Sequence, residues 1–480
     1  MSSVERAAAS GLRASALARA AGQLVSWAST LLVLRLLVPD DYGLMAIVAT
    51  LIGIGTAVAD FGLSASLIQA RELERTILAR LAGLIWALHL LMFLAMLAAG
   101  PLFAWLYSDP RLALLTQVAG VQFLFAGACA VPYALAARAM GFAWLARVEL
   151  LATLLSCCAT LALAVAGAGV WALVGGLLAG AVARALLLIV DGENVRPDFR
   201  LQGVEAHLAF SGKMAASHLL WTGVSQADVL IGGKLLARDA LGLYSVGSYL
   251  ATLPMHKIMG VASQIVFSAA ARLQSESERL RMRVLQGSRL MMAAAVGLLW
   301  GLAAVAPEFV PLVLGAQWEP AVTPLQLVSA VVPLRMLMML LASAVGGAGA
   351  IDVNLRNTIS AALVWPPCLF VGAHWGAPGL AAAWLVASPL TFALNAARIG
   401  AVLGIRVREL LELLGKPAAA GVALWVSVAA VRWSIDAAGM AATRLALFIV
   451  IGALVYVGVL TLFDRRLWPD LRRFALATRG

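Results

Sequence analysis

The feature that most constrains this chain is a series of apolar stretches, each about 20 residues long, separated by short clusters of charged residues. A helix of about 20 apolar residues is long enough to cross the hydrocarbon core of a bilayer. Lipid-exposed backbone must satisfy its own hydrogen bonds, so each stretch is predicted to be a helix. About fourteen such stretches occur, near residues 15–37, 43–66, 81–106, 112–135, 148–167, 169–190, 211–233, 241–264, 288–314, 322–348, 358–374, 377–399, 417–434 and 443–463.

The composition agrees with this pattern. Of the 480 residues, 62% are hydrophobic and 12% are charged, whereas a soluble domain has roughly 45–50% and about 25%. A water-soluble core could not bury so large an apolar surface, but a bilayer can. The sequence therefore predicts an all-α polytopic membrane protein without a water-soluble domain large enough to carry chemistry of its own.

The positive charge is distributed unevenly between the two sides of the membrane. The formal net charge of +11 could suggest nucleic acid as a partner. However, alternate loops on one side hold about 27 of the 35 Lys and Arg residues, and loops on the other side hold about six. This bias places both termini in the cytoplasm. The basic residues are interpreted as topology signals that also contact anionic membrane lipid, and no nucleic-acid partner is expected.

Two loops carry similar sequences. Residues 35–44 read RLLVPDDYGL and residues 234–243 read KLLARDALGL, each between two predicted spans. Asp40 and Asp239 could cap the helices that follow. A structural role alone, or chance recurrence of a short apolar motif, would also explain the likeness.

An even number of spans separates the two copies, so the halves are predicted to have the same orientation. Parallel repeats of this kind occur in secondary transporters, with the substrate site at the repeat interface. The predicted organisation is a six-helix bundle over residues 1–200, a second over 201–400, and two further transmembrane helices with a cytoplasmic tail over 401–480. The charged segment 191–210 would join the bundles.

The motifs also resemble a known family. Residues 35–44, DFGLSASLIQ at 60–69, DVLIGGKLL at 228–236 and GLYS at 242–245 are similar to segments of the polysaccharide-transporter proteins. These are lipid-linked oligosaccharide flippases of the multidrug/oligosaccharidyl-lipid/polysaccharide exporter superfamily. The resemblance is clear in the first, second, seventh and eighth spans, whereas the tenth to fourteenth spans carry no matching motif.

The resemblance implies a V-shaped pair of bundles around a central, partly cationic cavity in the bacterial inner membrane. Such a protein alternates between two openings and moves an undecaprenyl-diphosphate-linked oligosaccharide from the cytoplasmic to the periplasmic leaflet. The product would serve exopolysaccharide, capsule or lipopolysaccharide biosynthesis. The polysaccharide polymerase and its chain-length machinery are candidate partners, and no cofactor or metal is expected.

Two basic residues lie deep within predicted spans, where a charge costs several kcal/mol and usually faces a cavity or a partner. Lys257 follows Pro254 in the eighth span, and Arg335 follows Pro333 in the tenth. We predict that both bind the diphosphate, Arg through a forked set of donors and Lys as a point charge. The alternative is a buried ion pair or a side chain that snorkels to the interface.

Further polar residues are candidates for coupling, gating or the cavity wall. Asp60 and Asp228 could carry a coupling proton or could be structural, and Glu149 is expected at the inner interface beside Arg147. The residues assigned to gating are Arg35, Lys234 and Pro254. A polar stripe on the seventh span, predicted to line the cavity or to hydrogen-bond between helices, consists of His218, Thr222, Ser225 and Gln226.

Other functions fit the sequence less well. A membrane polymerase or glycosyltransferase generally has a large outer loop or an acidic outer motif, and the loops here are short. A drug or cation antiporter of the same superfamily needs an acidic cavity, whereas the deep charges include two bases. A flippase for a peptidoglycan precursor or teichoic acid stays open as a close variant. The four cysteines have no metal-binding spacing.

Overall fold

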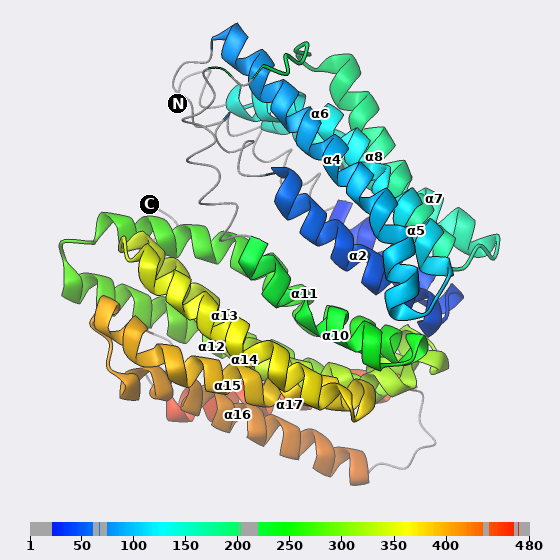
Figure 1. Cartoon of the computed structure of the whole chain (residues 1–480). Coiled ribbons are helices and arrows are strands. Elements are labelled where there is room, and N and C mark those ends of the chain that lie inside the picture. Colours follow the sequence, from blue (N-terminus) through cyan, green and yellow to red (C-terminus); the bar gives the residue numbers. More distant parts are fainter. Residues whose placement is uncertain are drawn as a thin grey trace. The chain divides into compact units, whose positions relative to one another are not determined.

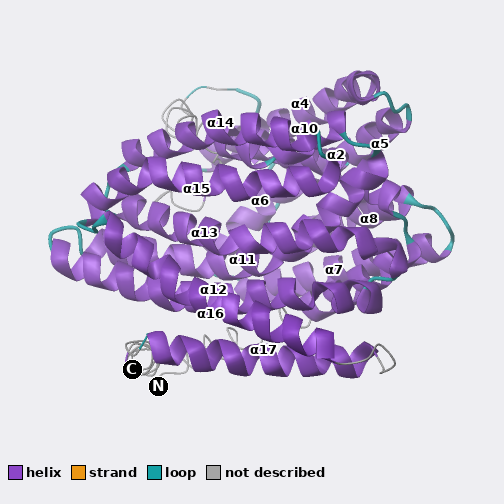
Figure 2. Cartoon of the chain, turned by 90° about the horizontal axis from the view of Figure 1, so that it is seen from below, coloured by secondary structure: helices purple, strands orange, loops and turns teal. Residues whose placement is uncertain are grey.

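The computed structural model describes residues 22–60, 74–200, 219–434 and 441–464, together with Leu67, Gln202 and Pro469. The regular elements in these ranges are helices (Figure 1), and the same chain coloured by secondary structure shows no strand in the described part (Figure 2). The predicted all-α class is confirmed.

The chain divides into two compact units, Met1–Lys234 and Leu235–Gly480. The assignment of residues 1–200, 201–400 and 401–480 to two repeats and two further helices stays a prediction.

Among the described residues, the first unit contains a helical segment over residues 22–36 and, near its end, a helical segment over 219–225 followed by α10. Its other helices pack as neighbours in sequence, above all α7 with α8 and α4 with α5. A Cβ on Gly176 would lie 1.7 Å from Thr160 Oγ1, so glycine permits the close approach of α7 and α8. The bounds are α2 Pro39–Asp60, α4 Arg75–Tyr107, α5 Arg111–Gly120, α6 Gln122–Arg138, α7 Phe142–Val165, α8 Val170–Asp191 and α10 Ala227–Leu235.

The second unit is built around α13, which packs against α11, α12 and α15. The two C-terminal helices, α16 and α17, pack on α12 and on each other, and their buried apolar side chains belong to the same core cluster as those of α12. The bounds are α11 Arg238–Arg272, α12 Ser277–Val313, η1 Ala316–Ala321, α13 Val322–Gly347, α14 Ile351–Ala373, α15 Gly376–Leu403, α16 Val407–Ser434 and α17 Ala441–Phe463.

Each of the predicted spans overlaps a helix in the described part of the chain. Ten helical segments there are long and apolar enough to cross a membrane, and α5 and α6 together form one of them. The helices α11 and α14 are also long enough to cross a membrane, but they are not among the ten. Polar residues, such as Lys257 in α11 and Arg356 in α14, interrupt their apolar sequence. The polytopic membrane fold is confirmed, and the total of fourteen spans stays a prediction.

The two similar loops have the same local structure. In one copy the helix ends at Leu36, Leu37 forms a bend and α2 begins at Pro39. In the other the helix ends at Leu235, Leu236 forms a bend and α11 begins at Arg238. Leu37 and Leu236 are both buried. The sequence repeat is therefore also a repeat of local backbone structure.

The proposed capping by the two aspartates is wrong for Asp40. Its carboxylate accepts a hydrogen bond of 2.7 Å from Arg111, and Asp41 instead accepts one from the backbone N–H of Val38. Asp239 lies in the first turn of α11, but the N-cap residue is Ala237 and forms no side-chain cap. Both aspartates still lie where a negative charge is favourable, near the positive end of a helix dipole.

Candidate functional site

Arg335, on α13, is held against two tryptophans of the second unit. Its guanidinium carbon lies 4.4 Å from the ring centroid of Trp384 on α15 and 5.5 Å from that of Trp365 on α14. A guanidinium over an indole ring at this distance is a cation–π contact. The contact fixes the position of a charge that would otherwise be carried on a long, flexible side chain.

The tryptophans are fixed in turn by hydrogen bonds. Nε1 of Trp384 donates to Oη of Tyr244 at 2.9 Å, and Nε1 of Trp365 donates to Oγ1 of Thr391 at 3.0 Å. The two indole rings pack edge to face, with centroids 4.9 Å apart. All four of these side chains are buried. We call Tyr244, Trp365 and Trp384 the aromatic shelf.

Lys257 follows His256 in α11, and α11 packs against α13, which carries Arg335. The charges of Lys257 and Arg335 both act on His256 by Coulombic interaction, and binding of one anion by Lys257 and Arg335 stays a prediction. Lys257 and His256 are exposed in the structure, and Arg335 is half-buried. We call His256, Lys257 and Arg335 the basic cluster.

Prolines precede both predicted anion-binding residues within their helices. Pro254 lies inside α11 and Pro333 inside α13. Proline removes one backbone hydrogen bond and bends or loosens a helix at that point. The sequence pattern selected Lys257, Arg335 and Pro254, whose roles stay predictions, and it did not single out His256 or the aromatic shelf. The tryptophans are separated from Arg335 in sequence, and only the packing of α13, α14 and α15 reveals them.

The polar stripe of the seventh span is only partly described, since His218 lies outside the described residues. The hydroxyl of Ser225 donates to the backbone oxygen of Thr222 at 2.9 Å. A Cβ on Gly53 of α2 would lie 3.2 Å from Nε2 of Gln226, so this amide packs against α2. The helix is interrupted at Gln226, just before α10. The role of the stripe as a cavity wall stays a prediction.

The residues predicted to couple or gate lie in the first unit, apart from Pro254. Oδ1 of Asp228 accepts a hydrogen bond of 2.8 Å from the N–H of Val229. Asp60 ends α2, and its side chain lies outside the described residues. The Lys234 ammonium donates to the backbone oxygen of Leu106 at the end of α4, and Arg35 is exposed. Their roles stay predictions.

Glu149 has a different partner from the one expected. Its two carboxylate oxygens accept hydrogen bonds of 2.9 Å each from Nε and Nη2 of Arg184 on α8. The prediction that Glu149 sits beside Arg147 overlooked this bidentate pair across the α7–α8 hairpin. The signal that could have revealed it is Arg184 itself, a single base well inside the sixth apolar stretch.

Nothing in the described part of the chain resembles a metal centre. No group of three or more His, Cys, Asp or Glu residues there is arranged to hold a metal ion. All four cysteines are free thiols.

Comparison with known proteins places the chain among polysaccharide biosynthesis proteins. A family model described as "polysaccharide biosynthesis protein" matches residues 32–323. The teichuronic acid biosynthesis protein TuaB of Bacillus subtilis (strain 168) is 24% identical over 416 residues, which are 84% of this chain and 84% of TuaB. The lipopolysaccharide biosynthesis protein WzxC of Escherichia coli (strain K12) is 24% identical over 397 residues, which are 80% and 79% of the two chains.

A solved structure shares the fold of the chain. The lipid II flippase MurJ, in an inward closed conformation, has a TM-score of 0.73 and 12% sequence identity. The match covers 94% of this chain and 99% of MurJ. At this identity the likeness shows the fold alone. The resemblance inferred from the loop motifs is confirmed by the family model, whose match over residues 32–323 includes all of the motifs that suggested it.

Proposed function

The chain belongs to the polysaccharide biosynthesis protein family, and from this we propose that it is a flippase for an undecaprenyl-diphosphate-linked oligosaccharide. It moves the repeat unit from the cytoplasmic to the periplasmic leaflet of the bacterial inner membrane. The exported unit is then available for exopolysaccharide, capsule or lipopolysaccharide biosynthesis.

The observation that carries this proposal is the basic cluster on α11 and α13. A diphosphate has several negatively charged oxygens close together, and it is bound best by bases that approach it from different elements. Arg335 offers a planar fork of donors and Lys257 a mobile ammonium. Because charges within a membrane helix avoid lipid, Lys257 and Arg335 are expected to face water or substrate.

The aromatic shelf supports the same role for Arg335. A guanidinium fixed by two indole rings is already oriented before the substrate binds, so less side-chain entropy is lost on binding. The rings also shield one face of the guanidinium from water, which strengthens the attraction between its charge and an anion. A base that served only as a topology signal would need no such support.

The same cluster disfavours an exporter of small cations. Repulsion among His256, Lys257 and Arg335 would raise the free energy of a bound cation, whereas it is relieved by an anion. We therefore favour a lipid-linked anion over a cationic drug as the substrate.

The topology follows the distribution of Lys and Arg. We propose that both termini are cytoplasmic, which places the basic ends of α12 and α16 at the cytoplasmic surface. The glycan-lipid is the substrate, and the polysaccharide polymerase with its chain-length machinery is the proposed partner on the opposite side.

The experiment that tests the function is complementation of a polysaccharide-export mutant. Lys257→Ala and Arg335→Ala should each lower export at least tenfold, while the amount of protein in the membrane stays near that of the wild type. Arg356→Ala is the matched control, because Arg356 is an exposed base on α14 outside the cluster. Its export should be unchanged.

The conservative variants separate charge from geometry. Lys257→Arg should retain most export, since a point charge is sufficient there. Arg335→Lys should not, because an ammonium lacks the planar fork that stacks on the shelf. Full export by both alanine variants would remove the anion site, and loss of both proteins from the membrane would show that the two charges are structural.

A further inference from the structure

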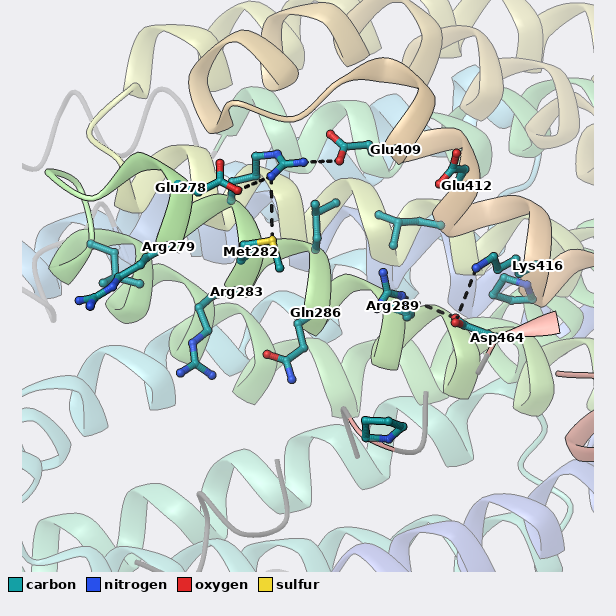
Figure 3. Close-up of a pocket in the computed structure, with 16 residues that line it drawn as sticks. Glu278, Arg279, Met282, Arg283, Gln286, Arg289, Glu409, Glu412, Lys416 and Asp464 are labelled. Carbon is teal, nitrogen blue, oxygen red and sulfur yellow. Dashed lines mark hydrogen bonds and ion pairs between the residues drawn. The ribbon is translucent and has the colours of Figure 1, made fainter. Parts of the chain in front are cut away.

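The second unit contains a cavity of about 1040 Å³ between α12, α16 and the residues after α17. It lies apart from the basic cluster, since none of its lining residues comes from α11 or α13. Five bases line it, namely Arg279, Arg281, Arg283, Arg289 and Lys416. Figure 3 shows these residues with the acidic side chains among them.

The cavity lies where three helices change from apolar to charged. In α12 the apolar run begins after Arg289, and in α16 it begins after Lys416. The apolar run of α17 ends at Phe463, directly before Asp464. At 1.5 Å per residue the 37 residues of α12 span about 55 Å, more than the roughly 30 Å of a hydrocarbon core. The charged beginning of α12 therefore extends beyond the bilayer, and the cavity lies at its surface.

The centre of the cavity is an acid between two bases. Asp464 is 3% exposed. Its two carboxylate oxygens lie 3.6 Å from Nε of Arg289 and 3.6 Å from Nζ of Lys416. Figure 3 shows these bases directed at Asp464 from two different helices. Both distances exceed that of a hydrogen bond, and Oδ1 of Asp464 is buried without a hydrogen-bond partner.

Four acids line the cavity beside the five bases, namely Glu278, Glu409, Glu412 and Asp464, so the formal charge of its lining is +1. Arg281 is paired with Glu278 and Glu409, so it is neutralised within the protein. One carboxylate, Asp464, faces both Arg289 and Lys416. Arg283 is exposed and has no acidic partner among the described residues. A ligand that supplies negative charge would therefore be attracted to Arg283, Arg289 and Lys416.

We propose that this cavity binds lipid-borne phosphate, the headgroup of an anionic lipid. Arg283, Arg289 and Lys416 would bind the phosphate oxygens, while Asp464 keeps the two inner bases in place. Apolar residues, including Met282 and Leu285 of α12, also line the cavity and suit the glycerol and first methylene groups. A free phosphate would leave this apolar part of the wall without a partner, so a lipid is the better ligand.

The proposal is tested by lipid binding to the full-length protein purified in detergent. Native mass spectrometry would follow titrations with phosphatidylglycerol, phosphatidylcholine, a polyprenyl diphosphate and inorganic phosphate. One phosphatidylglycerol should bind per chain at least tenfold more tightly than phosphatidylcholine. Arg283→Gln should weaken the binding of phosphatidylglycerol several-fold. The triple variant, which combines Arg283→Gln, Arg289→Gln and Lys416→Gln, should bind phosphatidylglycerol no more tightly than phosphatidylcholine.

Arg356→Gln and Lys257→Ala are the control variants, and Arg283→Gln is the test that does not depend on the triple variant. Arg356→Gln removes a base from the same predicted side of the membrane but outside the cavity, and it should bind phosphatidylglycerol like the wild type. Arg283→Gln removes no ion pair from the described structure, so it reports on binding even if the triple variant is unstable. Lys257→Ala should leave binding unchanged, so failure of the flippase assignment and failure of this proposal give different results.

The outcomes are distinct. Tighter binding of the polyprenyl diphosphate, with the same dependence on Arg283, would support the site and identify the glycan-lipid as its ligand. Equal binding of phosphatidylglycerol and phosphatidylcholine would overturn the proposal. The proposal would also be overturned if both Arg283→Gln and the triple variant bound phosphatidylglycerol as tightly as the wild type. Inorganic phosphate that binds as tightly as the lipids would overturn the assignment to a lipid.

Discussion

The guanidinium of Arg335 lies 4.4 Å above the indole ring of Trp384, although the two residues belong to different helices of the second unit. Trp384 is in turn hydrogen-bonded to Tyr244 of α11. The same indole therefore connects α13, α15 and α11, the first and last of which also carry the basic cluster. A substitution of Trp384 should therefore affect substrate binding at the proposed site as well as the stability of the fold.

We predict that Trp384→Phe lowers both stability and export. Phenylalanine keeps a ring beneath Arg335, but it cannot donate to Tyr244 and is the weaker cation–π partner. Loss of a buried neutral hydrogen bond costs about 0.5–1.5 kcal/mol, and the weakened stacking adds to this. Thermal unfolding of the purified protein and export by the variant would measure the two effects.

Trp375→Phe is the control for that prediction. Trp375 is 70% exposed and precedes α15, so its replacement should change neither the unfolding temperature nor export. If Trp384→Phe unfolds at the wild-type temperature and exports normally, the shelf does not position Arg335.

We predict that two glycines of α12 respond in opposite ways to alanine. A Cβ on Gly297 would lie 2.6 Å from Cε1 of Tyr456, whose hydroxyl donates to the backbone oxygen of Ala293 at 2.7 Å. The ring is buried and cannot move away, so Gly297→Ala should destabilise the packing of α17 on α12 by about 1–3 kcal/mol. Thermal unfolding would show the loss.

Gly301, one turn further along α12, has more space. The nearest atom to a Cβ there is Cδ1 of Leu424, at 3.9 Å. Gly301→Ala should therefore be neutral, or stabilising by up to about 1 kcal/mol through helix propensity. Equal effects at the two positions would contradict the packing of α17 described here.

The helices could be predicted from sequence because hydropathy is a local property. A run such as Ala441–Phe463 must be helical in lipid whatever it packs against. The repeated loops could also be predicted, since the same residue pattern gives the same bend at Leu37 and Leu236. Even Lys257 and Arg335 could be selected, because a base deep in an apolar stretch is rare enough to stand out.

The partners of these residues could not be predicted in the same way. The indole beneath Arg335 and the guanidinium that binds Glu149 come from other helices, and hydropathy contains no information on which helical faces meet. Asp40 illustrates the same limit. Its position before a helix suggested a cap, but Arg111, which is distant in sequence, lies within 2.7 Å, and a charged partner is stronger than a backbone N–H.

We predict that the Glu149–Arg184 pair has a structural role. Replacing both residues should therefore lower the stability of the protein less than replacing either one. Each single variant, Glu149→Gln or Arg184→Gln, leaves an unpaired polar or charged group within the α7–α8 hairpin. Breaking a fully buried pair costs about 3–5 kcal/mol, but these side chains are 41% and 42% exposed, so the loss should be well below that. A double-mutant cycle in thermal unfolding would measure the coupling, and additive losses would contradict it.

The last prediction concerns orientation and rests on the distribution of Lys and Arg. Ser108 follows α4 and Ser275 lies between α11 and α12, and both are exposed. If the basic loops are cytoplasmic, a cysteine at Ser108 faces the periplasm and one at Ser275 the cytoplasm. In a background without the four native cysteines, an impermeant thiol reagent should label intact cells at Ser108→Cys and not at Ser275→Cys.

Permeabilised cells provide the control, because both positions should then react at similar rates. That result would show that any difference in intact cells is due to the membrane rather than to local burial. Labelling of Ser275→Cys but not Ser108→Cys in intact cells would invert the topology. The cavity lined by Arg289 and Lys416 would then face the periplasm, and the proposed cytoplasmic location of both termini would be wrong.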